Sequence, residues 1–191
     1  MDKKRDPSIC CLQEVYFRPE DTFNLKVRGW RTIYHATGCQ KNAGVAILIS
    51  EKLGFKLKTE TRGEDGHYII ITGSIQKEEL TFVNVYATNV REPEWINPLM
   101  INIHELIGKN MVITGNFNTP LTTMEKSCRQ KLKKETINKE VKGPIDWTDI
   151  FRSFHPKAAE HTFFLSAHGT FSKIDHMLAH KTALDKCKRM R

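Results

Sequence analysis

The run from Met111 to Pro120, with the sequence MVITGNFNTP, constrains the fold more than any other stretch of this chain. Three apolar residues lead into a Thr-Gly pair, and two asparagines follow at a spacing of two, which predicts a buried strand with a polar tip. Residues i and i+2 of a strand point to the same side. We therefore expect Asn116 and Asn118 to face one site, with Phe117 turned into the core between them.

A turn is the alternative for these residues, because Asn and Pro favour turns for conformational reasons alone. An N-x-N-x-P run can then be structural and carry no chemistry. Strand ends are also where α/β proteins place many of their ligand-binding groups. The choice between the two interpretations depends on what the other strand ends of the chain carry.

Size and charge narrow the class of protein. A chain of 191 residues fits one domain, and we expect residues 1–191 to form a single domain with a hydrophobic core. The 30 Lys and Arg residues exceed the 22 Asp and Glu residues and give a net charge of +8. This charge favours a polyanionic partner such as nucleic acid over an acidic small molecule, although a generally basic surface is the alternative.

Cysteine usage and hydropathy indicate the compartment. The five cysteines are scattered and form no C-x-x-C motif, which argues against a disulfide framework and against a structural zinc site. No apolar run approaches the roughly 18 to 20 residues of a membrane span, and the N-terminal residues are charged with no apolar segment behind them. We expect a nuclear or cytoplasmic protein that has no contact with a membrane.

Hydrophobic patterns predict a mixed α/β layered sandwich. Strands are expected at residues 8–15, 29–36, 44–50, 66–75, 80–87 and 111–118, and a charged Gln-Lys-Glu-Glu turn makes 66–75 and 80–87 a hairpin. Helices are expected at 93–108 and 147–154, and the lysine-rich segment 126–142 is expected to be a basic surface helix, with a mobile loop as the alternative. A final hairpin is expected from 161–165 and 172–178.

Polar groups stand at four of the predicted strand ends. They are Glu14, Tyr86 with Asn89, Asn116 with Asn118, and Asp175 with His176. Each has an ordinary structural explanation when it is taken singly: Glu14 a solvated acid, Tyr86 a core tyrosine and Asp175 a surface acid in an ion pair. Their order along the chain is more specific than any one of them.

In that order, the chain resembles the metal-dependent endonuclease/exonuclease/phosphatase family, which includes exonuclease III, the abasic-site endonucleases and DNase I. Its strongest likeness is to the endonuclease domain of LINE-type retrotransposons. The matching segments cover nearly the whole chain: 6–14, 29–34, 43–50, 66–68, 84–87, 115–120, 155–156, 161–164 and 172–176. The resemblance implies a four-layer α/β/β/α sandwich of two mixed β-sheets flanked by helices, with the active site at the edge where strand tips converge.

The resemblance also implies the chemistry, which is hydrolysis of a phosphodiester with Mg²⁺ or Mn²⁺. Glu14 matches the family's metal ligand, Tyr86 the tyrosine that contacts the scissile phosphate, and Asn118 the asparagine that holds the attacking water or a phosphate oxygen. Asp175 matches the carboxylate that orients a catalytic histidine. Hard Mg²⁺ suits such a site because it prefers carboxylate and water oxygens.

DNA is the implied partner, and we expect a monomer with no small-molecule cofactor beyond the metal. The residues that we expect to contact nucleic acid are Asn89, Lys126, Arg129, Thr162 and Ser172.

The chain departs from the family at the tip of its central strand. The family has aspartate at the position of Asn116, in the pattern Gly-Asp-Phe-Asn, and that carboxylate positions or deprotonates the attacking water. A carboxamide is neutral and cannot accept this proton. Loss of a general base slows a reaction by about 10²- to 10⁴-fold. We therefore expect Asn116 to occupy a catalytic position and to weaken or abolish catalysis.

Other departures point the same way. The family's Glu-Thr-His appears as Glu14-Val-Tyr, and its Tyr-Ala-Pro-Asn as Tyr86-Ala-Thr-Asn. The family's first strand and its terminal Ser-Asp-His motif have no counterpart in these residues, so we expect a domain that is incomplete at both termini. His176 cannot replace the missing histidine, because it points to the opposite face from Asp175. A nucleic-acid-binding pseudoenzyme or a non-functional retroelement remnant is therefore the alternative to a weak endonuclease.

Overall fold

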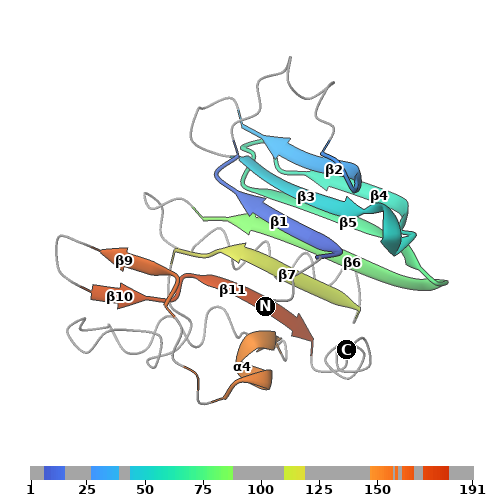
Figure 1. The fold of residues 1–191 in the computed structure, drawn as a ribbon. Coiled ribbons are helices and arrows are strands. Elements are labelled where there is room, and N and C mark those ends of the chain that lie inside the picture. Colours follow the sequence, from blue (N-terminus) through green and yellow to red (C-terminus); the bar gives the residue numbers. More distant parts are fainter. Residues whose placement is uncertain are drawn as a thin grey trace. The chain divides into compact units, whose positions relative to one another are not determined.

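The computed structural model describes residues 7–15, 27–38, 44–87, 110–118, 147–156, 158, 161–165 and 170–180 (Figure 1). The chain divides into two compact units, Met1–Tyr86 and Ala87–Arg191. The helices predicted at 93–108 and 126–142 lie outside the described residues. In the parts of the chain that are described, no helix is long and apolar enough to cross a membrane.

The first unit contains two antiparallel arrays of strands. One has the order β1-β3-β2 and the other β4-β5-β6. Their bounds are β1 Ile9–Gln13, β2 Trp30–Thr37, β3 Gly44–Ser50, β4 Lys56–Arg62, β5 Tyr68–Ile75 and β6 Glu78–Tyr86, with a short 3-10 helix, η1, at Glu51–Leu53.

The two arrays pack face to face, with β3 against β5 and β6, β1 against β6 and β2 against β5 (Figure 1). Apolar side chains from both arrays fill the space between them, among them Val45, Ile47, Ile69, Ile71 and Phe82. β3 is buried at every position; it is the central strand of its array, and one of its faces packs against the other array. This agrees with its almost entirely apolar sequence.

Two features of the second array differ from the sequence prediction. β4 was not predicted, because its alternating Lys, Thr, Glu and Arg residues lack an apolar face; most of β4 is exposed at the edge of the array. The predicted hairpin of β5 and β6 is confirmed, but its turn is shorter than expected. Only Gln76 and Lys77 connect the strands, both with left-handed backbone at φ of 50° and 73°. Two such residues match the twist of a tight hairpin.

The second unit contains the antiparallel order β7-β11-β8 and a separate hairpin of β9 and β10. The bounds are β7 Met111–Asn116, β8 Trp147–Asp149, β9 Phe163–Leu165, β10 Thr170–Ser172 and β11 Asp175–His180. One helix, α4 at Ile150–Phe154, packs on β11. Ile150 and Ala179 are buried together there, with Val112 and Phe154 packed around them.

Two predicted elements of the second unit are wrong in their bounds. The helix expected at 147–154 begins only at Ile150, because Trp147–Asp149 pairs with β11 as a strand and the Asp149 side chain caps the helix. The strand expected at 172–178 is two strands. β10 ends at Ser172 and pairs with β9, whereas β11 begins at Asp175 and pairs with β7 and β8.

Candidate functional site

Glu14 and Tyr86 contact each other at the ends of two strands of the first unit. Glu14 directly follows β1 and has left-handed backbone, with φ of 56°. Tyr86 ends β6, and its buried hydroxyl group donates a hydrogen bond of 2.9 Å to Oε1 of Glu14. Left-handed backbone is uncommon in residues other than glycine, and such strained residues concentrate at functional sites. The contact holds an exposed carboxylate against a fixed phenol.

A fully buried carboxamide lies next to this pair. Asn84 accepts a hydrogen bond of 2.6 Å from Nε2 of Gln13 through its Oδ1. Its Nδ2 donates to the carbonyl oxygens of Leu12 and Ala46, at 2.8 and 2.9 Å. Asn84 was not among the site residues predicted from the sequence, although a polar residue between Val83 and Val85, two positions before Tyr86, was a usable signal.

In the second unit, the predicted strand tip brings Asn116 and Asp175 together. Asn116 is the last residue of β7 and Asp175 the first of β11, and the two are directly opposite in the antiparallel register. Directly opposite residues have their side chains on the same face. Phe117, the next residue, is 2% exposed and forms an edge-on contact with the His176 ring at 5.9 Å between centroids. The prediction that Phe117 turns into the core is confirmed.

Asn118 is placed differently from the prediction. β7 ends at Asn116, so alternation does not extend to Asn118, whose backbone is left-handed with φ of 50°. Its amide N–H donates to Oδ1 of Asn116 at 2.8 Å, and its side-chain amide donates to the carbonyl oxygen of Ala87. The turn interpretation is therefore correct for the local hydrogen bonds, since the Asn116 side chain bonds the backbone two residues on.

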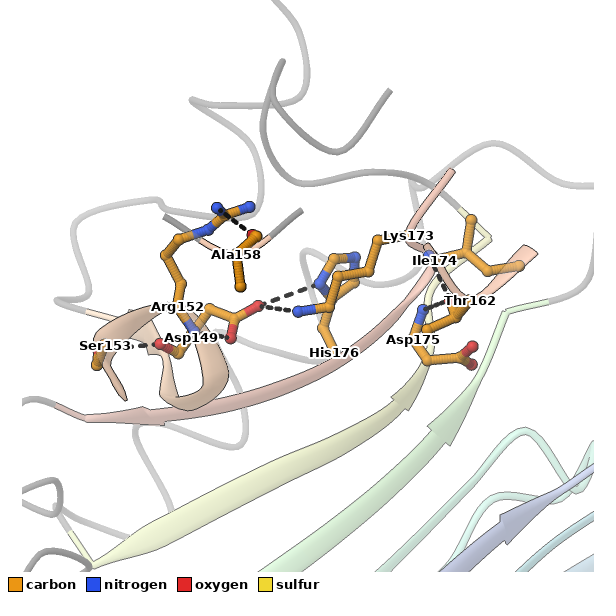
Figure 2. Close-up of polar contacts among 9 residues, drawn as sticks. All are labelled: Asp149, Arg152, Ser153, Ala158, Thr162, Lys173, Ile174, Asp175 and His176. Carbon is orange, nitrogen blue, oxygen red and sulfur yellow. Dashed lines mark hydrogen bonds and ion pairs between the residues drawn. The ribbon is translucent and has the colours of Figure 1, made fainter. Parts of the chain in front are cut away.

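The hydroxyl group of Thr162 supports the start of β11. Its Oγ1 accepts hydrogen bonds from the backbone N–H groups of Ile174 and Asp175, at 3.0 and 3.3 Å (Figure 2). The Thr162 N–H donates to the carbonyl oxygen of Ser172, which is itself buried. Nucleic-acid contact by these two residues stays a prediction. The other expected nucleic-acid contacts, Asn89, Lys126 and Arg129, lie outside the described residues.

His176 and Asp175 lie on opposite faces of β11. His176 points toward Asp149, while the Asp175 carboxyl group points away from Asp149 (Figure 2). The expectation that His176 and Asp175 face opposite sides is confirmed. Oδ2 of Asp149 lies 3.4 Å from Nζ of Lys173 and 3.3 Å from Nδ1 of His176. Lys173 also lies over the Phe151 ring, 4.3 Å from its centroid.

This buried cluster shifts the titration of Asp149. Burial by itself raises the pKa of the Asp149 carboxyl group. Hydrogen bonds from His176 and from the Arg152 amide, with the positive charges of Lys173 and His176, outweigh burial and lower the pKa to about 2. Asp149 was not among the site residues predicted from the sequence. Its signal was the pattern of a helix cap, a short polar residue directly before a helical segment.

Among the described residues, Glu14 offers an exposed carboxylate at the end of a strand. No group of three or more His, Cys, Asp or Glu side chains among them is arranged to hold a metal ion. Mg²⁺ usually keeps several water ligands and binds through one or two carboxylates. Glu14, exposed and fixed by Tyr86, fits as one such carboxylate.

No family model matches this sequence, whereas solved structures match most of its length. The endonuclease domain of TRAS1, a telomere-specific non-LTR retrotransposon, is 15% identical with a TM-score of 0.64, over 93% of this chain and 74% of that one. The AP endonuclease LMAP from Leishmania major is 14% identical with a TM-score of 0.68, over 94% and 71%. The 3′ phosphatase NExo from Neisseria is 20% identical with a TM-score of 0.67, over 94% and 78%.

The chain has the DNase I-like endonuclease/exonuclease/phosphatase fold. The fold class and the family resemblance inferred from the sequence are thereby confirmed. At these identities the likeness establishes the fold, and what the chain does is a separate question.

Proposed function

We propose that this DNase I-like chain is a Mg²⁺-dependent phosphodiester hydrolase of the DNA endonuclease type, derived from a retrotransposon endonuclease and impaired in its activity. The observation that carries the proposal is the hydrogen bond of 2.9 Å between the Tyr86 hydroxyl group and Glu14 at the ends of β6 and β1. It joins, in one unit, the two residues that match a metal ligand and a phosphate contact. The matching solved structures, which include a retrotransposon endonuclease and an AP endonuclease, support the proposal.

Glu14 would hold the cation, with Mn²⁺ as a substitute for Mg²⁺. When bound, the cation would supply positive charge to the phosphate oxygens. Tyr86 fixes one carboxylate oxygen of Glu14 by its hydrogen bond, which limits the directions that the carboxylate can take. Asn118 uses one of its two side-chain N–H groups on Ala87, which leaves an N–H donor and a carbonyl acceptor for a water molecule or a phosphate oxygen.

Asn116 explains why we propose impaired activity. In hydrolysis, a water oxygen attacks phosphorus, a P–O ester bond breaks, and the water must give up a proton. A carboxylate at position 116 can accept that proton, whereas the amide of Asn116 cannot. The loss amounts to about 10²- to 10⁴-fold in rate, or roughly 3 to 5.5 kcal/mol of barrier. The Asn116 side chain keeps a structural use as the acceptor of the Asn118 N–H.

A supercoiled-plasmid nicking assay with Mg²⁺ tests the proposal. The wild-type chain should nick slowly, Glu14→Ala should show background nicking only, and Asn116→Asp should nick faster by the factor given above. If wild type and Asn116→Asp both equal Glu14→Ala, the hydrolase proposal is wrong. Activity in Asn116→Asp alone would assign the defect to the amide at position 116.

A nucleic-acid-binding protein without catalysis is the second candidate, favoured by the net charge of +8 together with the amide at position 116. Binding that depends on phosphate contacts releases counterions, so affinity should fall steeply as salt is added. Fluorescence anisotropy with a labelled duplex, measured from low to moderate salt, tests this candidate. An affinity that does not change over that range would contradict it.

A further inference from the structure

The Asn84 side chain joins three backbone segments inside the first unit's described core. It projects from β6, makes hydrogen bonds to Leu12 and Gln13 of β1 and to Ala46 of β3, and has no exposed surface. A buried carboxamide is tolerated when its hydrogen-bonding groups are paired. The Oδ1 and Nδ2 atoms of Asn84 together form three hydrogen bonds, and all three connect the β4-β5-β6 array to the β1-β3-β2 array.

Two of these hydrogen bonds hold the residues of β1 that directly precede Glu14. Asn84 and Tyr86 are two residues apart in β6 and therefore lie on the same face of the strand. Asn84 bonds the backbone of Leu12 and the side chain of Gln13, and Tyr86 bonds the side chain of Glu14, the next residue. Three consecutive residues of the chain are thus tied to one face of β6.

Glu14 needs such support because of its backbone. Its φ of 56° is unfavourable for a residue with a side chain, and residues of this kind persist where the surrounding structure determines them. The N–H of Val15 donates to the carbonyl oxygen of Gly44 at 3.0 Å, which holds the chain after Glu14 on β3. Asn84 holds the chain before Glu14 on both β6 and β3.

We infer that Asn84 is a positioning residue, which acts through the end of β1 to hold the Glu14 carboxylate against Tyr86. As a contribution to metal binding and hydrolysis, this role rests on the proposed function. The chemistry of the site selects asparagine. Two carbonyl oxygens require N–H donors and the Gln13 amide requires an acceptor, and a carboxamide supplies both. Aspartate lacks the donors, and leucine lacks donors and acceptor.

The first experiment uses metal-free protein and NMR. In the wild type we expect a nuclear Overhauser effect between the Tyr86 ring and the Glu14 side chain, and a strong one between the amide and α protons of Glu14, which reports its left-handed backbone. Asn84→Leu should lose both signals while the core methyl resonances keep their positions. A folded Asn84→Leu that keeps both signals at wild-type intensity would overturn the inference.

The matched control is Thr81→Val, in the same strand. Thr81 is buried and shares a hydrogen bond of 3.0 Å with Thr72, and it lies three residues before Asn84 and so on the other face of β6. Its loss removes a buried hydrogen bond without touching β1, and both Glu14 signals should stay. If Asn84→Leu does not fold, Gln13→Met replaces it. That variant removes only the 2.6 Å hydrogen bond and should weaken both signals, and unchanged signals would again overturn the inference.

A Mn²⁺ titration separates this inference from the proposed function. Mn²⁺ bound at Glu14 should broaden the Glu14 and Tyr86 resonances. Residues that orient a metal ligand typically contribute about 10- to 100-fold in affinity. Asn84→Leu should therefore need at least about tenfold more Mn²⁺ than Thr81→Val, and equal requirements would overturn the positioning role. Failure of Mn²⁺ to broaden these resonances in the wild type would count against the proposed metal site, while the metal-free signals would still decide what Asn84 does.

Discussion

Asp175 lies directly opposite Asn116 in the antiparallel pairing of β11 with β7. Both residues are partly exposed at the strand ends, with their side chains on one face. If position 116 carried aspartate, two carboxylates would face each other across the strands. Compared with an aspartate at this position, the amide of Asn116 therefore lacks the proton acceptor and also avoids a contact between like charges.

Asn116→Asp should lower the stability of the metal-free protein. Like charges directly opposite in a sheet are unfavourable by roughly 0.2–1 kcal/mol. The loss should shrink at about 1 M salt, where the screening length is about 3 Å. Urea unfolding at low and high salt measures it. The control is the same substitution in an Asp175→Asn background, where the repulsion is absent; an equal loss of stability in both backgrounds would contradict the explanation.

Tyr86→Phe should remove the hydrogen bond to Glu14 and keep the ring in place. The expected loss in free energy of unfolding is about 1 kcal/mol, typical of one intramolecular hydrogen bond. A double-mutant cycle with Glu14→Gln isolates the interaction between the two side chains. If the two substitutions are additive, the hydrogen bond contributes nothing and the argument that Tyr86 fixes the carboxylate fails.

The sequence predicted those parts of the fold whose pattern of apolar residues is compatible with only one type of element. β3, at Gly44–Ser50, matches its predicted bounds because an apolar run of that length favours a central strand that is buried at every position. β4 was missed because its sequence has no buried face and its pairing with β5 determines its conformation. The segment at 147–154 was assigned wholly to a helix because its apolar spacing does not show that Trp147–Asp149 pairs with β11.

The candidate site also contains residues that local sequence patterns predicted and residues whose placement depends on distant contacts. The strand-end positions of Tyr86 and Asn116 came from local patterns, and both are the last residues of their strands. The left-handed backbone of Glu14 and the hydrogen bonds of Asn84 depend on residues some 70 positions apart, as for Asn84 and Leu12, whose separation is 72. A local sequence pattern cannot show contacts between residues that are so far apart in the chain. Asp149 was missed for the same reason, since Lys173 and His176 come from a different segment.

Lys77→Gly should stabilise the protein, because Lys77 has left-handed backbone in the two-residue turn between β5 and β6. Glycine adopts this conformation without the cost of about 1–2 kcal/mol that a side chain incurs. Its greater freedom in the unfolded chain offsets part of the gain, so the net effect should be about 0.5–1 kcal/mol. Lys56→Gly, at an extended and exposed position in β4, is the control and should destabilise by a similar amount. Urea unfolding that shows a loss for Lys77→Gly would contradict the turn geometry.

Asp149→Asn should flatten the dependence of stability on pH in the acid range. The pKa of Asp149 in the folded protein is about 2, below its ordinary value of 3.8. A carboxyl group with a lowered pKa contributes stability above its unfolded pKa, and that contribution is lost as pH falls through the folded pKa. The wild type should therefore lose about 2 kcal/mol of stability from this group between about pH 4 and pH 2.

The substitution also separates charge from helix capping. Asparagine caps helices as well as aspartate does, so Asp149→Asn keeps the acceptor for the Arg152 N–H, which lies 3.0 Å from Oδ1. At neutral pH the variant leaves the buried Lys173 without its counter-charge, which typically costs about 3–5 kcal/mol. Asp175→Asn, in the same unit but facing away from the cluster, is the matched control and should keep the wild-type acid profile (Figure 2). If Asp149→Asn and the wild type lose equal stability between pH 4 and pH 2, the cluster around Asp149 does not lower its pKa and the assignment is wrong.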